Sequence, residues 1–391
     1  MRRRVLLGSA AAAALAPRAG RAQAPGIKVA FVATLSGPGA AIGNQLRDGW
    51  LAGMKHLDGK LGGIPVQTLV VDDELKPDVA LTKVGAALER DKVDFVAGVV
   101  FSNILQAIFR PVIESGTFLI SANAGPSTYA GKGCNPHLFV TSYQNDQPHA
   151  AMGQVAQDAG YKRVIVLVPN YQAGKDAANG FRSRFKGEVV DEIYVPLTQL
   201  DFSTEVAKIA AAKPDAVFTF MPGGLGVNLV RAYRQAGLAA IPFLSTFTID
   251  EATLPAHGDA AIGFFTTATW GPDFTAGDSQ RFVKDFEAAY GYVPGNYAAH
   301  AYDTAMLLDS AVRSVGGKIA DKAALRAALE KADFRSLRGN FRFGVNHYPI
   351  EDFWLFKVVK RPDGKYQTET VRKVLSGETD AYAAECKMPD L

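Results

Sequence analysis

The sequence predicts an α/β protein built of two lobes, and three observations support this fold class. Short apolar, β-rich segments alternate with segments of helical period, which is typical of a parallel sheet covered on both faces. This alternation runs from about 28 to 121 and restarts at 163. There is neither a low-complexity stretch nor a long linker between the halves, so we expect the lobes to be in close contact.

The first half contains four predicted strands separated by helices. Ile42, Leu46 and Trp50 recur at helical spacing and therefore predict one buried helix face. Pro77 suits the first turn of a helix that runs to about residue 90, and Ser102 or Asn103 can cap the helix that follows the third strand. The predicted strands are 28–35, 67–71, 95–100 and 117–121, and the first two helices are 42–57 and 77–90.

The second half repeats this pattern and ends in a hairpin. The turn Pro362-Asp363-Gly364 separates two strands, 353–359 and 368–374. Because later segments resemble pieces of either half, we expect the chain to cross between the lobes several times. The other predicted strands are 163–169, 189–195, 216–220 and 242–245. One predicted helix ends near residue 186, and the others span 203–212, 225–236, 278–290 and 296–315.

Residues 1–24 have the pattern of a signal peptide. A basic start, Arg2 to Arg4, precedes a short apolar run that is too short to span a bilayer. Ala22-Gln23-Ala24 supplies small residues for cleavage after Ala24, or after Ala22 because Pro25 is unfavourable next to a cleavage site. Arg-Arg-x-Val-Leu fits a twin-arginine signal as well as the ordinary secretory route. We therefore expect a periplasmic protein, in a compartment without soluble ATP or NAD.

The leader also accounts for the basic character of the full chain. Its five charged residues are arginines, so its removal changes the net charge from +3 to −2. No basic patch remains to indicate a nucleic-acid partner. The two cysteines, Cys134 and Cys386, favour one disulfide in an oxidising compartment, with two free thiols as the alternative. Neither cysteine lies at the leader boundary, so no lipid anchor is indicated.

An NAD-dependent enzyme is one competing interpretation. Gly37, Gly39 and Gly43 follow a strand and open a helix, and Asp72 ends the next strand, which approximates a dinucleotide-binding fingerprint. However, the third glycine comes one residue late, and the export leader argues against a soluble cofactor. No hydrolase motif is present, and Cys134-x-x-His137 has no second ligand pair. We expect no enzyme activity, no cofactor and no metal.

The loops after the predicted strands are rich in hydroxyl, amide, glycine and aromatic residues and carry few charges. Ligands of open α/β sheets bind at these carboxyl ends. The free amides at the helix start near Ser102, together with the loop amides of Ala124 and Gly125, would suit a carboxylate. The aromatic residues of these loops could form the wall of an apolar cleft, although each taken singly fits an ordinary core position equally well.

These residues resemble the type I periplasmic solute-binding proteins of the leucine/isoleucine/valine-binding family, which serve ABC transporters. The matching stretches are KVAFVATLSGPGAAIG at 28–43, Val71-Asp72-Asp73, FVAGVVFSNILQ at 95–106 and Tyr302-Asp303. The resemblance covers essentially the whole mature chain. It implies two Rossmann-like lobes, three hinge crossings and a ligand held between the lobes.

The resemblance also implies domain boundaries and a mode of action. The expected crossings lie near Thr141-Ser142, Thr248-Ile249 and Arg342-Phe343. Lobe 1 is then 25–141 with 249–342, and lobe 2 is 142–248 with 343–391. We expect clamshell closure on a ligand, recognition of the closed form by permease and ATPase subunits, and a monomeric state. A ligand-sensing subunit of a signalling receptor is the alternative from another functional class.

The family pattern assigns roles to several loop residues. Ser102 matches the serine that holds the ligand carboxylate, and Asn123 and Gly125 match positions that bind the α-amino and α-carboxylate groups. Where amino-acid binders place an acid to meet the α-ammonium, this sequence has Phe247, although Asp250 lies close enough to substitute. We therefore predict an aromatic or other apolar carboxylate ligand, with a branched-chain amino acid as the alternative. The candidate ligand-binding residues are Ala41, Ile42, Phe101, Ser102, Asn103, Asn123, Ala124, Gly125, Tyr143, Tyr171, Gln172, Met221, Pro222, Phe247 and Trp270.

Overall fold

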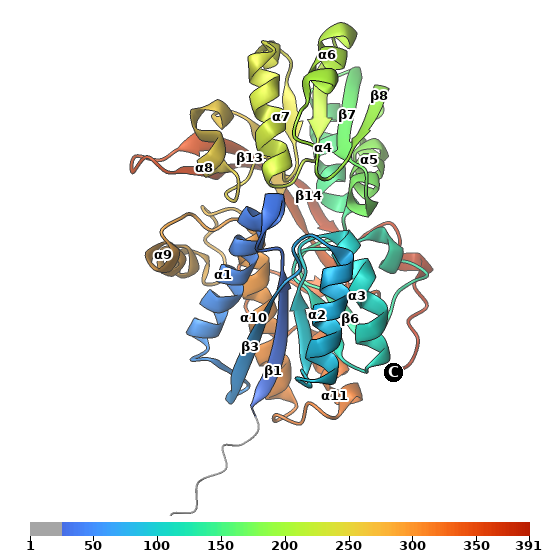
Figure 1. The fold of residues 1–391 in the computed structure, drawn as a ribbon, viewed down its shortest axis with the longest axis vertical. Coiled ribbons are helices and arrows are strands. Elements are labelled where there is room, and N and C mark those ends of the chain that lie inside the picture. The colour runs from blue at the N-terminus through green and yellow to red at the C-terminus, as the bar shows by residue number, and fades with distance from the viewer. Residues whose placement is uncertain (1–25) are drawn as a thin grey trace, which may run out of the picture.

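The computed structural model of the chain describes residues 26–391, so the predicted signal peptide lies outside the described residues. The chain forms two α/β lobes, each with its own sheet, as Figure 1 shows. This arrangement confirms the predicted fold class. In the part of the chain that the structure describes, no helix has the length and apolar character needed to cross a membrane.

The first sheet has the strand order β2-β3-β1-β4-β5-β6 and lies in the lower lobe of Figure 1. Every pairing in it is parallel except the β2–β3 hairpin. The central strand is buried along nearly its whole length, and Phe31 stacks on Trp50 with ring centroids 5.2 Å apart. The strands are β1 (Ile27–Ala33), β2 (Lys60–Leu61), β3 (Ile64–Asp72), β4 (Phe95–Gly98), β5 (Phe118–Ser121) and β6 (Leu138–Val140).

Helices from two distant parts of the sequence pack around the first sheet. Ile42, Leu46 and Trp50 are buried on one helix face, as the apolar spacing predicts, and Pro77 stands in the first turn of its helix. These helices are α1 (Ala40–His56), α2 (Pro77–Glu89), α3 (Ser102–Glu114), α9 (Ser279–Tyr290), α10 (Asn296–Ser314) and α11 (Lys322–Lys331).

The second sheet has the order β12-β13-β11-β10-β9-β7-β8, with β14 paired to β13. Its strands are β7 (Arg163–Pro169), β8 (Glu188–Val195), β9 (Ala216–Thr219), β10 (Phe243–Ser245), β11 (Phe265–Ala268), β12 (Arg342–Phe343), β13 (Pro349–Lys360) and β14 (Tyr366–Glu378). Its helices are α4 (Asp146–Asp158), α5 (Gln172–Arg184), α6 (Ser203–Ala212), α7 (Gly224–Gln235) and α8 (Leu254–His257).

The second crossing lies later in the chain than the sequence predicts. β11 pairs in parallel with β10 and antiparallel with β13, so it belongs to the second sheet. Leu254 and Ala261, which come before it, are buried in the second lobe's core. The stretch 249–268, assigned above to lobe 1, therefore lies with lobe 2, and the chain crosses after Ala268. The Thr248-Ile249 boundary is wrong because the four-residue strand β11 is too short to show a period in the sequence.

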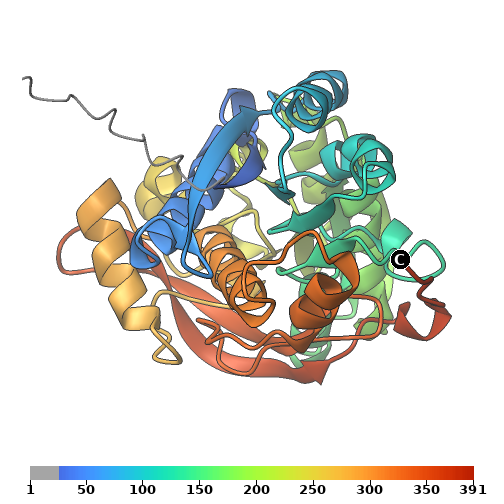
Figure 2. The ribbon, with the colours of Figure 1, turned by 90° about the horizontal axis from the view of Figure 1, so that it is seen from below.

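The C-terminal tail also departs from the predicted boundaries. Beyond β14 the chain returns to the first lobe: Asp380 accepts a hydrogen bond at 2.8 Å from Asn346, which also donates to the Ala130 carbonyl of that lobe at 2.7 Å. Cys386 forms a disulfide with Cys134, across a sequence separation of 252 residues. The C-terminus accordingly lies beside the lower lobe in Figure 1, and Figure 2 shows the β13–β14 hairpin in red along one side of the molecule. The segment assigned to lobe 2 as 343–391 thus ends on lobe 1.

Several elements are absent from the prediction because their patterns are weak. β6 and β11 have only three and four residues, and α4 includes Pro148 and Gly153, which both disfavour a helix interior. Gly153 is nevertheless suited to its place, because a Cβ there would lie 2.2 Å from the carbonyl oxygen of Phe181 on α5. The close packing of α4 on α5 thus requires a glycine that the helix propensity argues against.

Candidate functional site

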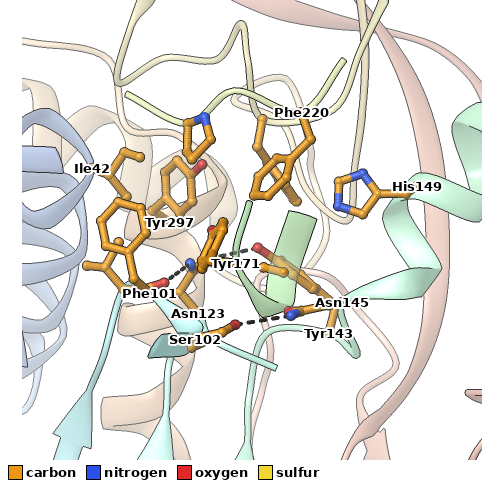
Figure 3. Close-up of a pocket in the computed structure, with 15 residues that line it drawn as sticks. Ile42, Phe101, Ser102, Asn123, Tyr143, Asn145, His149, Tyr171, Phe220 and Tyr297 are labelled. Carbon is orange, nitrogen blue, oxygen red and sulfur yellow. Dashed lines mark hydrogen bonds between the residues drawn. The ribbon is translucent and has the colours of Figure 1, made fainter. Parts of the chain in front are cut away.

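A small cavity lies between the two lobes, at the carboxyl ends of strands from both sheets (Figure 3). Its walls are mainly aromatic, and none of its lining side chains is an aspartate, glutamate, lysine or arginine. The lining residues are Ile42, Val100, Phe101, Ser102, Asn123, Ala124, Tyr143, Asn145, His149, Tyr171, Ala173, Phe220, Pro222, Phe247 and Tyr297.

Nine of the fifteen candidate ligand-binding residues line this cavity and six do not. The nine are Ile42, Phe101, Ser102, Asn123, Ala124, Tyr143, Tyr171, Pro222 and Phe247. Among the six, Ala41 is exposed on α1 and Met221 lies in the core of the second lobe. Gln172 bonds to Asp176, and Trp270 is buried in a separate core cluster, where its indole donates to Ser279 at 3.1 Å. The remaining two are Asn103 and Gly125.

Ser102 has a hydroxyl that is free to donate, and it lies at the start of a helix. It is the first residue of α3, whose initial amides have no carbonyl four residues earlier to bond. Asn145 donates to the Ser102 hydroxyl oxygen at 3.1 Å, which leaves the hydroxyl hydrogen free to donate in turn. Figure 3 shows this bond on the floor of the cavity. The hydroxyl and the helix end together favour an anionic group at this position.

The polar groups of the loop 123–125 form hydrogen bonds within the protein. This differs from the expectation that the amides of Ala124 and Gly125 are free to bind a carboxylate. The Ala124 amide donates to Val99, and the Gly125 amide donates to the Asn145 side chain at 3.1 Å. Asn123 donates to the Val100 carbonyl at 2.7 Å and accepts from the Tyr143 hydroxyl at 2.9 Å. These groups fix the shape of the cavity, and Ser102 remains as the free polar group on this side.

Stacked aromatic rings form the walls. Phe247 stacks on Tyr143 with centroids 5.1 Å apart and lies 5.7 Å from Tyr297. Tyr171 faces Phe101 and Phe220, each at 6.3 Å. Phe247 adopts a φ of 56°, a left-handed conformation that is costly for a bulky side chain and is typical of functional loops. Thr246 and Thr248, its neighbours, instead bond within the second sheet.

His149 is the most informative lining residue that sequence reasoning missed. It lies on α4 and is buried against the rings of Phe218 and Phe220, and its Nδ1 has no hydrogen-bond partner in the described chain. Burial lowers the pKa of His149 to about 3, so the ring is neutral at neutral pH. An apolar period through Ala151, Met152 and Val155 could have predicted α4 and thereby placed this residue. The other lining residues that sequence reasoning missed are Val100, Asn145, Ala173, Phe220 and Tyr297.

Asp250 lies behind the cavity wall rather than in its lining. The Ala252 amide donates to its Oδ1 at 3.0 Å, whereas Oδ2 has no partner within residues 26–391. Burial and the neighbouring Glu251 raise the pKa of Asp250 to about 7, and the Tyr297 hydroxyl acts in the opposite direction. Tyr297 therefore stands between this carboxyl and the cavity.

The two lobes touch on either side of the cavity. The Ser127 hydroxyl on the first lobe donates to Asp176 on α5 at 2.6 Å, and Asn145 donates to the same carboxylate at 2.9 Å. At the opposite rim, a Cβ on Gly223 would lie 2.5 Å from the Pro38 carbonyl oxygen. Figure 1 shows the start of α1 meeting α7 here. The cavity is thus closed by contacts that join the lobes.

A buried arginine joins two of the chain crossings behind the cavity. Arg338 donates to the carbonyl oxygens of Thr141 and Ser142 at 2.6 and 2.9 Å. It also pairs with Asp303 on α10 and Glu351 on β13, at 3.1 and 2.7 Å. These bonds fix the first crossing against β13 and thereby set the geometry of the hinge side.

The glycine turn does not resemble a dinucleotide site in its geometry. A Cβ on Gly43 would lie 1.7 Å from the Thr34 carbonyl oxygen, so this glycine permits α1 to pack against β1. Asp72 accepts hydrogen bonds from the amides of Leu35 and Glu74, both at 2.9 Å, which occupy the oxygen that a ribose would need. Within residues 26–391, no group of three or more histidine, cysteine, aspartate or glutamate side chains is placed to hold a metal ion.

Comparison with known proteins gives consistent results. Residues 26–365 match the family described as periplasmic binding protein. The chain is 32% identical to a solute-binding protein of an ABC transporter from R. palustris in complex with benzoate, with a TM-score of 0.87 over 93% of this chain and 100% of that one. A second R. palustris solute-binding protein, in complex with 4-hydroxybenzoate, is 26% identical, with a TM-score of 0.84 over 90% and 98%. Leu/Ile/Val-binding protein homolog 6 of Brucella melitensis is 29% identical over 90% of this chain and 93% of its own length.

Proposed function

The chain belongs to the periplasmic binding protein family, and we propose that it is the solute-binding component of an ABC importer for an aromatic carboxylate. The ligand binds between the lobes, with its carboxylate at Ser102 and its ring between the aromatic walls. The similar R. palustris proteins, which are complexes with benzoate and 4-hydroxybenzoate, support this ligand class.

One observation carries the choice of ligand. The lining of the cavity is aromatic and has no charged side chain, while Ser102 supplies a free donor at the start of α3. A buried ammonium without an acidic partner would be costly, whereas a carboxylate is stabilised by the helix end and the hydroxyl. A ring without an amino group fits these surroundings.

A panel of ligands tests this proposal. We expect benzoate, hydroxybenzoates or cinnamate-type acids to raise the melting temperature of the protein, because a ligand that binds only the folded state stabilises it. Benzyl alcohol serves as the matched control, since it keeps the ring and lacks the carboxylate. Stabilisation by leucine together with no response to any aromatic acid would exclude the proposed ligand class.

A branched-chain amino acid is the second candidate, and Asp250 favours it. Its unpartnered Oδ2 lies beside Tyr297, a residue of the cavity lining, and would serve as the partner of an ammonium if that tyrosine moved aside. The Brucella relative is named as a Leu/Ile/Val-binding homologue. On this alternative, Asp250→Asn abolishes stabilisation by leucine and leaves the binding of aromatic acids unchanged.

The expected partners and compartment follow from the proposed role. The leader at residues 1–24 directs the chain to the periplasm, where the closed, ligand-bound form docks as a monomer on permease and ATPase subunits. Ligand binding needs neither a metal nor a cofactor. Ligand-dependent stimulation of ATP hydrolysis by the reconstituted transporter tests this role, whereas stimulation of a sensor kinase would support the signalling alternative.

A further inference from the structure

The polar groups of the cavity fall into two sets, those already bonded and those still free. Asn123, Asn145 and Tyr143 use their side chains in hydrogen bonds within the protein. In the described chain, the Ser102 hydroxyl lacks an acceptor, and no hydrogen bond is found for the hydroxyls of Tyr171 and Tyr297 or for the His149 ring. The free groups are therefore the ones available to a ligand.

The free groups lie on opposite sides of the cavity. Ser102 belongs to α3 of the first lobe, whereas His149 lies on α4 and Tyr171 precedes α5, both on the second lobe. In Figure 3 the His149 imidazole reaches into the site beside Phe220, well away from Ser102. A ligand that satisfies both sides needs a carboxylate at one end and a second polar group at the other.

The surroundings of His149 define the chemistry of that second group. Its neighbours are the rings of Phe218, Phe220 and Phe247, with centroids 5.8, 4.9 and 6.2 Å away, so the protein offers it no charged partner. Burial keeps the imidazole neutral, and a neutral imidazole has one N–H donor and one acceptor nitrogen. A hydroxyl can donate to it or accept from it, whereas a second carboxylate would find no counter-charge.

We propose that His149 is a specificity-determining residue that binds a hydroxyl substituent on the ligand ring, so that the cavity prefers hydroxylated aromatic carboxylates. This inference rests on the proposed function and adds to it the chemical group that the ligand carries at the end remote from its carboxylate. A buried polar group is costly to leave unpaired, so an unsubstituted ring leaves His149 unsatisfied. Because His149 lies on the second lobe, the hydroxyl also links the ligand to the lobe that closes.

Matched ligand pairs measured by calorimetry test the proposal. For wild-type protein we expect at least one of 2-, 3- or 4-hydroxybenzoate to bind roughly ten-fold or more tightly than the methylbenzoate with the same substitution pattern. Hydroxyl and methyl groups are similar in size, so the ratio isolates the hydrogen bond from filling of the cavity. This comparison requires no variant and is therefore independent of any folding defect.

Variants then assign the preference to His149. His149→Phe should remove the hydroxyl preference and leave benzoate affinity within about two-fold, while His149→Gln, which keeps a donor and an acceptor, retains part of it. His137→Phe, at a half-buried histidine outside the cavity lining, is the control and should bind as wild type. Equal affinity for hydroxyl and methyl ligands, or an undiminished preference in His149→Phe, overturns the proposal. Failure of every aromatic acid to bind would instead reject the proposed function.

Discussion

The Ser127 hydroxyl of the first lobe donates a 2.6 Å hydrogen bond to the Asp176 carboxylate of the second lobe, and the Ser127 amide donates to the same group at 3.1 Å. Asp176 is fully buried and also accepts bonds from Asn145 and Gln172. Asn145 and Gln172 lie on the same lobe as Asp176, so the two bonds from Ser127 are the ones that depend on the lobes being together. Opening of the lobes would thus remove the two Ser127 bonds from this buried carboxylate.

The first prediction concerns this contact. Ser127→Ala should weaken ligand affinity by about ten-fold, because it removes a hydrogen bond to a charged group that contributes about 1.5–3 kcal/mol to the closed form. Titration calorimetry measures the affinity, and small-angle scattering reports the more open average shape. Ser203→Ala is the matched control, since Ser203 donates to Asp201 within the second lobe alone. Equal loss of affinity in both variants would count against an interlobe role.

The second prediction concerns the opposite rim. Gly223 has a φ of 66°, and an added Cβ would lie 2.5 Å from the Pro38 carbonyl oxygen of the other lobe. Gly223→Ala should therefore obstruct closure and lower ligand affinity by at least ten-fold. Gly258→Ala is the control, because Gly258 has nearly the same backbone conformation (φ 56°, ψ −143°, against 66° and −137° at Gly223) and an added Cβ there would lie 3.8 Å from the Tyr366 hydroxyl. Both variants place an alanine in the same glycine-type backbone conformation, so the steric contact with Pro38 separates them.

The sequence predicts the regular elements well and the connections between lobes poorly. The spacing of Ile42, Leu46 and Trp50 is enough to define α1, because one apolar face of a helix is a local property. The assignment of β11 to the second sheet depends on pairing with β10 and β13, and the position of the tail depends on the bond to Cys134. Such pairings join residues far apart in the chain and leave no local period.

A similar limit applies to the cavity. Ser102 is predictable because a serine at a helix start after a buried strand commonly either binds an anion or caps the helix. Trp270 and Met221 have the same aromatic or apolar character as the lining residues but pack in cores on either side of the cavity. His149 escapes prediction because α4 contains a proline and a glycine. Whether such a residue lines the cavity or packs in a core depends on the direction of its side chain rather than on its type.

The third prediction concerns Ser102. Ser102→Ala should weaken the binding of aromatic carboxylates by about ten-fold or more, since a hydrogen bond to a charged group is removed inside the cavity between the lobes. The melting temperature of the ligand-free protein should change little, because Asn145 keeps its bonds to Asp176 and Gly125. Ser115→Ala, at the far end of the same helix, should bind as wild type, since Ser115 bonds only to Val112 and Thr117. Unchanged affinity in Ser102→Ala would place the carboxylate elsewhere.

The last prediction concerns the pH dependence of stability. In the unfolded chain His149 gains a proton below about pH 6.5, whereas in the folded protein burial keeps its pKa at about 3. Because the unfolded state then binds more protons, His149 contributes stability above pH 6.5 that is lost as the pH falls from about 6.5 towards 3.

The wild-type protein should therefore lose stability relative to His149→Phe by about 1.4 kcal/mol for each pH unit below 6.5. Urea unfolding of both proteins at about pH 5 and pH 7.5 measures this difference. Buried groups such as His257 and Asp250 titrate in both proteins, so their contributions cancel in the comparison. A difference that is independent of pH would mean that the folded protein protonates His149 as readily as the unfolded chain does, which is incompatible with an imidazole buried among phenylalanine rings.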